Sequence, residues 1–113
     1  MNVQIFGTKK SFDSKKAERY FKERGIKYQF VDMKEKGLSK GEFNSVCQAV
    51  GGYEKLIDPK RKDKNLLALV QYLSEEDKKE KILENQKIIR TPIVRNGKQA
   101  TVGYEPDVWK DWK

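Results

Sequence analysis

The first 32 residues constrain the fold most, because a helix separates two short strands and only brief links join them. Residues 2–7 contain the apolar run of the first strand, and residues 27–32 alternate their side chains as a second strand does. Between them, one face of a helix over residues 13–24 carries the i, i+3, i+4, i+7 positions Ala17, Tyr20, Phe21 and Arg24. Gly25 is suited to end that helix. A strand, a helix and a strand with short links predict a parallel βαβ unit.

Helices are expected in the middle of the chain. Ser39 and Glu42 have the spacing of a capping box, which predicts a helix that runs to about Val50 and ends at two glycines. Residues 53–74 have a mostly helical pattern, broken by a proline and a basic run. The apolar positions of that region are Leu66, Leu67, Leu69 and Val70. A further helix is expected to begin after Ser74.

The last quarter of the chain has the pattern of a hairpin and a helix. Asn96-Gly97 lies between two β-prone runs, which is a strong hairpin signal. A short helix over Pro106–Trp112 follows. The sequence therefore predicts an α/β fold in one domain, residues 1–113, with a helical insert between an N-terminal βαβ unit and a C-terminal ββα unit.

Ser11 and Ser14 lie where the turn after the first strand leads into the first helix. A catalytic nucleophile at such a turn would gain reactivity. A helix N-terminus has unpaired N–H groups and a partial positive charge, and both favour an anion. Four lysines flank this turn: Lys9, Lys10, Lys15 and Lys16. A cysteine there would ionise readily, whereas the hydroxyl of Ser11 needs a neighbouring base. The chain has no histidine to act as one, so we expect Ser11 to be inert. The alternative for Ser11 is a helix cap or turn residue. Ser14 lies three positions after Ser11, with two residues between them.

A second candidate element lies shortly before the hairpin. Arg90 precedes Thr91-Pro92, and Arg95 lies within the first hairpin strand. An arginine close to a helix N-terminus suits an oxyanion or a carboxylate. The alternative for both arginines is an ordinary surface position, and the alternative for Pro92 is the first residue of a strand with a trans bond.

Cys47 is the one cysteine of the chain, so no internal disulfide can form. It shares an apolar helix face with Phe43, Val46 and Val50, which favours a buried structural thiol. A reactive or regulatory thiol is the alternative. The absence of histidine excludes Ser-His-Asp and Cys-His catalysis and the usual zinc sites, so we expect no metal.

The chain is basic, with 25 lysines and arginines, 17 acidic residues and a net charge of +8. A nucleic-acid partner is one interpretation, through the run over Lys60–Lys64, but no recognition motif accompanies it. We favour a solvated lysine-rich surface. The start of the sequence lacks a signal-peptide pattern and no apolar stretch could span a membrane, so we expect a monomeric, cytoplasmic protein. Aromatic residues near the C-terminus are expected to pack in the core: Tyr104, Trp109 and Trp112.

The whole pattern resembles the arsenate reductase (ArsC)/Spx family of thioredoxin-fold proteins, and its glutaredoxin-related branch in particular. The segments that carry the resemblance are Phe6–Lys10, Lys16–Ala17, Leu38–Ser39, Thr91–Gly97 and Val102–Tyr104. The resemblance implies a thioredoxin-like fold and a cis Pro92 that faces the turn. In the family, a cysteine at the position of Ser11 attacks arsenate or a disulfide, and glutathione and glutaredoxin resolve the intermediate.

The chain departs from that family pattern at three positions. Ser11 replaces the nucleophile, and Ser14 replaces the second cysteine that Spx-type relatives use as a redox switch while they bind RNA polymerase. Thr91 stands where arsenate reductases have an oxyanion-binding arginine, and the nearest arginine is Arg90. The disulfide switch is therefore excluded, because it needs two thiols at this turn.

Two hypotheses follow from the resemblance. The first is a thiol-dependent reductase, inactive as written, with Lys10, Arg90, Thr91 and Pro92 as substrate-binding residues and glutathione as co-substrate rather than bound cofactor. Ser11 is then either natural, which gives a pseudo-enzyme, or an engineered trap. The second is a non-catalytic binding or regulatory module of Spx type, for RNA polymerase or a peptide.

Overall fold

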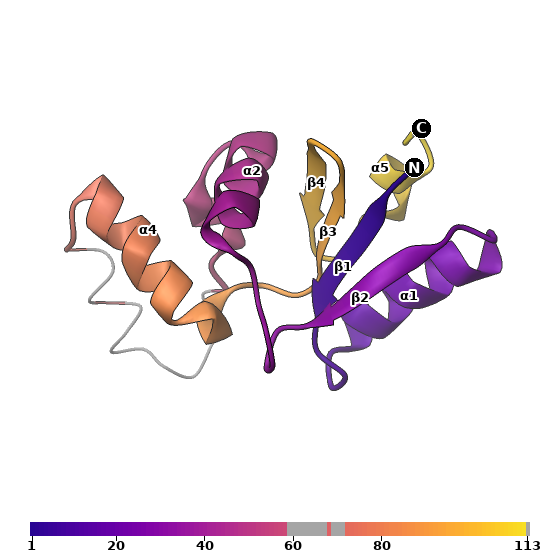
Figure 1. The fold of residues 1–113 in the computed structure, drawn as a ribbon, viewed down its shortest axis with the longest axis horizontal. Coiled ribbons are helices and arrows are strands. Elements are labelled where there is room, and N and C mark those ends of the chain that lie inside the picture. The colour runs from indigo at the N-terminus through magenta and orange to yellow at the C-terminus, as the bar shows by residue number, and fades with distance from the viewer. Residues whose placement is uncertain (59–67, 69–71, 113) are drawn as a thin grey trace.

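The computed structural model describes residues 1–58, 68 and 72–112. Its strands are β1 (Val3–Gly7), β2 (Tyr28–Asp32), β3 (Ile93–Asn96) and β4 (Gln99–Val102). Its α-helices are α1 (Phe12–Glu23), α2 (Lys40–Val50), α4 (Glu75–Glu84) and α5 (Pro106–Trp109). Two short 3-10 helices are η1 (Tyr53–Leu56) and η2 (Gln86–Ile88). Figure 1 shows the helical insert on one side of the sheet, with α1 and α5 on the other.

The four strands form one mixed sheet in the order β2-β1-β3-β4. β1 pairs with β2 in parallel and with β3 in antiparallel orientation, and β3 and β4 form the hairpin. The predicted βαβ unit, helical insert and ββα unit are therefore confirmed in that order along the chain.

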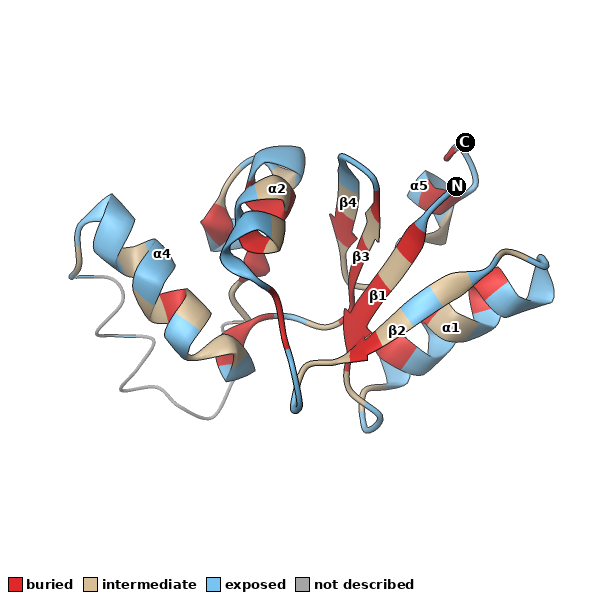
Figure 2. Cartoon of the chain, viewed as in Figure 1, coloured by how far each residue is buried: buried red, intermediate tan, exposed pale blue. Residues whose placement is uncertain are grey.

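Each face of the sheet has its own hydrophobic core (Figure 2). Side chains of a strand alternate between its faces, so Ile5 lies in one core and its neighbour Phe6 in the other. The core under α1 and α5 comprises Val3, Ile5, Ala17, Tyr20, Phe21, Val94, Trp109 and Trp112. The core under the insert includes Phe6, Val31, Leu38, Phe43, Val46, Cys47, Tyr53, Leu56, Ile82, Ile88, Ile89 and Ile93. Burial on both faces fixes the position of β1, which leads into the turn before α1.

The C-terminal aromatic residues anchor α5 on the first core. The Trp109 ring lies 5.2 Å from Tyr20 and 5.1 Å from Phe21 between centroids, and its Nε1–H donates to Thr101 Oγ1 at 2.7 Å. Core packing is confirmed for Trp109 and Trp112, whereas Tyr104 is 39% exposed at the edge of this cluster. Its ring lies edge-on to Trp109, with 5.6 Å between the ring centroids.

Local signals placed both ends of α2 and the start of α4 correctly. Ser39 Oγ accepts from the Glu42 N–H while the Glu42 carboxylate accepts from the Ser39 N–H, so the predicted capping box is present. Gly51 ends α2 in the left-handed conformation, with φ of +90°. Ser74 caps α4. The predicted basic run and the apolar positions between residues 59 and 71 lie outside the described residues.

Three local predictions were wrong in detail. The last helix, α5, ends at Trp109 rather than at Trp112. The hairpin loop is Gly97-Lys98 rather than Asn96-Gly97, because Asn96 still pairs with Gln99 as the last residue of β3. Asn96 is held there by the Asn2 N–H, which donates to Asn96 Oδ1 at 3.1 Å. Arg24 does not join the buried face of α1. It follows the helix, and its guanidinium lies 3.7 Å from the Tyr20 ring centroid.

None of the helices in the described part of the chain is both long and apolar enough to cross a membrane.

Candidate functional site

The sheet register brings the two candidate elements to one edge. Gly7 ends β1, and Phe6 pairs with Ile93 at the start of β3. The residues next in line are the turn after Gly7 on one strand and Pro92 on the other. The turn that leads to α1 and the Thr91-Pro92 segment therefore meet at the carboxyl end of β1, which is at the bottom of Figure 1.

Ser11 is the N-cap of α1. Its Oγ accepts from the Ser14 N–H at 3.2 Å, and its own N–H donates to the Thr8 carbonyl at 3.2 Å. The cap role that the sequence left as an alternative is thus the one observed. The Ser11 side chain is half-buried at the positive end of a helix of 12 residues. An acceptor atom at this position gains from the helix N–H groups, whether it belongs to a hydroxyl or to a thiolate.

Ser14 has a different environment from Ser11. Its side chain is completely buried, and its Oγ accepts from the Thr8 N–H at 3.3 Å. The hydroxyl ties the turn to the first turn of the helix and is closed off from solvent. The structure therefore places the Ser14 side chain inside the turn.

The Thr91-Pro92 peptide bond is cis. Pro92 is buried and its carbonyl accepts from the Gly103 N–H at 2.8 Å, while the Arg90 N–H donates to the Leu56 carbonyl at 2.7 Å. Within the described residues, no hydrogen bond engages the backbone N–H or carbonyl of Thr91. A half-buried backbone segment with an unused donor and acceptor at a sheet edge can pair with an extended ligand.

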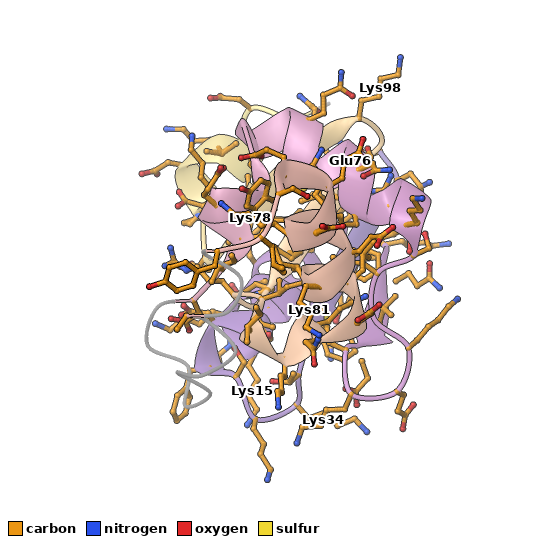
Figure 3. All side chains as sticks on the ribbon, turned by 90° about the vertical axis from the view of Figure 1, so that its left-hand side faces the viewer. Lys15, Lys34, Glu76, Lys78, Lys81 and Lys98 are labelled. Carbon is orange, nitrogen blue, oxygen red and sulfur yellow. The ribbon has the colours of Figure 1, made fainter. Side chains whose placement is uncertain are left out.

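The rim of this edge is positively charged. The side chains of Lys10 and Arg90 are both exposed, so both can reach an anion in solvent. The lysines around the turn are all exposed: Lys9, Lys10, Lys15 and Lys16. Asp13 is the one acid between residues 8 and 17. Figure 3 shows Lys15 at the lower end of the molecule and Lys98 at the upper end.

Arg95 lies away from this edge and has a structural position. Its Nη1 donates to Gln4 Oε1 at 2.8 Å and lies 3.7 Å from the Glu42 carboxylate on α2. Gln4 in turn donates to Gln29 on β2 at 3.3 Å. Arg95 is therefore not an ordinary surface arginine. It belongs to a row of hydrogen-bonded polar side chains, with Gln4 and Gln29, that crosses the sheet beneath α2.

Cys47 is buried in the core under the insert, as the sequence favoured. Burial raises the pKa of its thiol; the nearby positive charge of Lys79 opposes this, and Glu54 adds to it. A buried thiol with a raised pKa is mostly protonated at neutral pH and is a poor nucleophile. Cys47 therefore has the buried, structural position that its helix face indicated.

Sequence reasoning missed two features of this edge. Phe12, the first residue of α1, is 78% exposed beside Ser11, and its position outside the apolar helix face is a signal that could have shown this. Gln86 fixes the loop after β2: its amide bonds the Leu38 N–H at 2.7 Å and the Leu38 carbonyl at 2.8 Å. No local pattern indicates that contact, because its partners are 48 residues apart.

Metal binding has no support in the described part of the chain, where no group of three or more Cys, Asp or Glu side chains is placed to hold an ion.

A strand, an N-capped helix and a cis-proline strand that meet at one sheet edge define a thioredoxin-like fold. The ArsC family model matches residues 6–112, and the chain belongs to the ArsC family. No curated protein matches the chain.

Solved structures agree with this assignment. An arsenate reductase from Vibrio cholerae is 25% identical, with a TM-score of 0.82 over 96% of this chain and 94% of that one. The protein SACOL0876 from Staphylococcus aureus COL is 22% identical, with a TM-score of 0.79 over 96% of each chain. An arsenate reductase (ArsC) related protein from Brucella melitensis is 22% identical, with a TM-score of 0.65 over 99% of this chain and 94% of that one.

Proposed function

We propose that this chain is an arsenate-reductase-like member of its family that binds a thiol-linked or anionic substrate at the β1–α1 turn but does not complete the redox step. The observation that carries the proposal is the position of Ser11. Its Oγ lies at the N-terminus of α1, 3.2 Å from the Ser14 N–H, at the sheet edge that also holds Thr91-Pro92. This is the place where a cysteine would be activated.

The hydroxyl of Ser11 cannot replace a thiolate in this chemistry. A thiolate attacks the substrate and leaves as part of a disulfide, and an alkoxide forms no equivalent bond with a second thiol. A serine also needs a base to lose its proton, and the chain contains no histidine. Reductase activity is therefore expected to be absent in the chain as written.

The substrate-binding residues proposed for this site are Lys10, Arg90, Thr91 and Pro92. Lys10 and Arg90 are exposed cations, which suits a carboxylate or an oxyanion. Thr91 carries no charge, so the site lacks an arginine directly before Pro92 that could bind arsenate. Glutathione, with its two carboxylates and a peptide backbone, fits a rim of cations beside a free backbone segment better than arsenate does.

The test measures the thiol pKa of Ser11→Cys in a Cys47→Ala background. The pKa is obtained from the dependence of the alkylation rate on pH. We expect a pKa well below the free value of about 8.5. Ser74→Cys is a matched control, because Ser74 also caps a helix but is followed by three acids, Glu75, Glu76 and Asp77. Equal pKa values for the two thiols would mean that the turn does not activate a nucleophile, and the proposal would fail.

A second candidate is the non-catalytic binding or regulatory module of Spx type. The free backbone of Thr91 favours it, because peptide binding there needs no nucleophile. RNA polymerase, a peptide and glutaredoxin are the partners to compare. If Ser11→Cys titrates like a free thiol and the unmodified chain still binds one of them, this second function replaces the first.

A further inference from the structure

The outer edge of β2 lacks the features that usually protect an edge strand. β2 borders the sheet, and no strand in the described part of the chain pairs with its other side (Figure 1). Lysine, proline or a bulge commonly blunts such an edge, because an open edge can pair with another chain. Residues 28–32 contain no lysine, arginine or proline, and they pair with β1 in an unbroken register. The one charged side chain of the strand, Asp32, accepts from the Lys34 N–H at 3.0 Å within its own loop.

The backbone groups that face outward from β2 belong to alternate residues. The Met33 N–H donates to the Gly7 carbonyl at 2.9 Å, so residues 29, 31 and 33 face β1 while residues 28, 30 and 32 face away from it. The Asp32 carbonyl is used by the turn that follows the strand. Within the described residues, no hydrogen bond engages the N–H or carbonyl of Tyr28 and Phe30, or the N–H of Asp32. These groups can therefore pair with a further strand.

The hydrophobic core under α1 extends to the same edge. Tyr28 and Phe30 pack against that core, but both are only half-buried. The Tyr28 hydroxyl donates to Glu18 on α1 at 3.1 Å, which holds the start of β2 against the helix. Aromatic side chains at an open edge favour a partner that supplies apolar side chains as well as a strand, because cross-strand aromatic pairs stabilise a sheet.

The local charge permits a second copy of the chain at this edge. The chain has a net charge of +8, so repulsion opposes most orientations of two copies. The hollow beside Tyr28 is lined by two acids and two bases of α1: Glu18, Arg19, Lys22 and Glu23. Lys27 and Asp32, at the two ends of the strand, add one charge of each sign. A like-charged copy therefore meets both signs here and no excess of positive charge.

We propose that two copies of the chain associate through β2, with the two strands antiparallel and a two-fold axis at Phe30. Centring on Phe30 matches the outward-facing residues with one another. Phe30 then pairs with Phe30 of the second copy, and the Asp32 N–H of each copy donates to the Tyr28 carbonyl of the other. The two sheets become one continuous sheet. The inference goes beyond the proposed function, because it does not use the turn at Ser11, and it replaces the monomer expected from the sequence.

The first test is the oligomeric state of the complete chain. Sedimentation velocity is measured from about 5 µM to about 500 µM protein at about 0.15 M salt. We expect a monomer at the low end and a dimer at the high end, because one strand edge and the helix beside it bury less surface than a standard interface. A monomer throughout would overturn the inference, whether the edge stays in solvent or pairs with a strand of another protein.

The two-fold axis makes residue 30 the most informative position for substitution. We expect Phe30→Lys, and separately Phe30→Glu, to weaken association about tenfold or more, because like charges then lie directly opposite each other. A mixture of the two variants should associate about as strongly as the parent chain, because opposite charges then meet at the axis. No recovery in the mixture would reject the pairing centred on Phe30.

Two controls separate this contact from net charge and from loss of packing. Gln48 is exposed on α2, which packs against β4 at the opposite edge of the sheet. Gln48→Lys adds the same charge as Phe30→Lys and should associate like the parent chain. Phe30→Leu keeps an apolar side chain at the axis and should still dimerise. Equal weakening in Gln48→Lys and Phe30→Lys would reduce the effect to net charge and overturn the inference.

Hydrogen exchange in the parent chain tests the register without a substitution that could impair folding. The Phe30 N–H faces outward and should gain protection when the protein concentration is raised from the monomeric to the dimeric range. The Val31 N–H faces β1 already and should change little. Unchanged protection of Phe30 in a sample that dimerises would place the interface elsewhere and overturn the inference.

Discussion

The side chain of Ser14 occupies the space that a Cβ atom on Gly7 would need. Gly7 ends β1 and Ser14 lies in the first turn of α1, so the strand and the helix approach each other closely at the candidate site. The Ser14 Oγ is at the same time bound to the Thr8 N–H, so it cannot move aside without losing that bond.

Gly7→Ala is therefore expected to destabilise the chain by about 1–3 kcal/mol, the usual range for overpacking in a close-packed interior. Urea unfolding followed by circular dichroism measures this. Gly41→Ala is the matched control, because a Cβ on Gly41 in α2 meets no atom within 4 Å. It is expected to stabilise by about 0.5–1 kcal/mol. Equal effects at the two glycines would contradict the close approach of Gly7 and Ser14.

Gln86→Ala should loosen the loop that follows β2. The substitution leaves the N–H and carbonyl of Leu38 without their bonds to the Gln86 amide, and we expect a loss of about 1–3 kcal/mol in the free energy of unfolding. Hydrogen exchange of the Leu38 amide is the local measurement, and its protection should fall. The same change at Gln48, an exposed position on α2, serves as the control. Unchanged protection at Leu38 in Gln86→Ala would refute this role.

Tyr53 is expected to set an alkaline limit on stability. Burial, followed by its hydrogen bond to Glu75, raises the pKa of Tyr53 from its ordinary value of 10.0 to about 12. Below pH 10 the phenol is protonated in both states and adds no pH dependence. Between pH 10 and pH 12 the unfolded chain loses this proton while the folded chain keeps it, so stability falls as pH rises.

The measurement for Tyr53 is the free energy of unfolding at several alkaline pH values, with Tyr53→Phe beside the parent chain. The free energy of unfolding should decline less between pH 10 and pH 12 in Tyr53→Phe than in the parent chain. An identical pH profile in the two chains would show that Tyr53 does not carry this effect.

Cys47 should react slowly in the folded chain. Because burial raises the pKa of its thiol, we expect alkylation at neutral pH to be at least about tenfold slower in the native chain than in urea. Ser74→Cys in a Cys47→Ala background supplies an exposed reference thiol. Native Cys47 that reacts as fast as this reference would reopen its role as a working thiol.

Local patterns predicted the elements well. Spacings within one or two helical turns predicted the capping box of Ser39 and Glu42 and the buried face around Cys47. The order of strand, helix and strand predicted the βαβ unit. The order of strands along the chain was enough to expect the sheet. The hairpin loop was misplaced by one residue, because the contact that keeps Asn96 in β3 comes from Asn2 at the other end of the chain.

The candidate site was predictable only in part. The sequence indicated Ser11 as either a nucleophile position or a cap, but the burial of Ser14 depends on how closely β1 and α1 pack. Lys16 contacts the Tyr104 ring although the two residues are 88 positions apart. Hydrophobic periodicity describes neighbouring turns of one element and cannot predict a contact between such distant residues. The same holds for Gln86 and Leu38.

Ser11 also separates what the turn needs in order to fold from what it needs in order to react. Serine is among the preferred residues at a helix N-cap, and here its Oγ holds the Ser14 N–H. Exchanging a cysteine for a serine at this position therefore removes a reactive group without weakening the helix start. Folding needs an acceptor atom at residue 11, and under the proposed function only catalysis would need that atom to be sulfur. A chain that loses the catalytic requirement can keep the scaffold intact, and any binding that the scaffold performs survives with it.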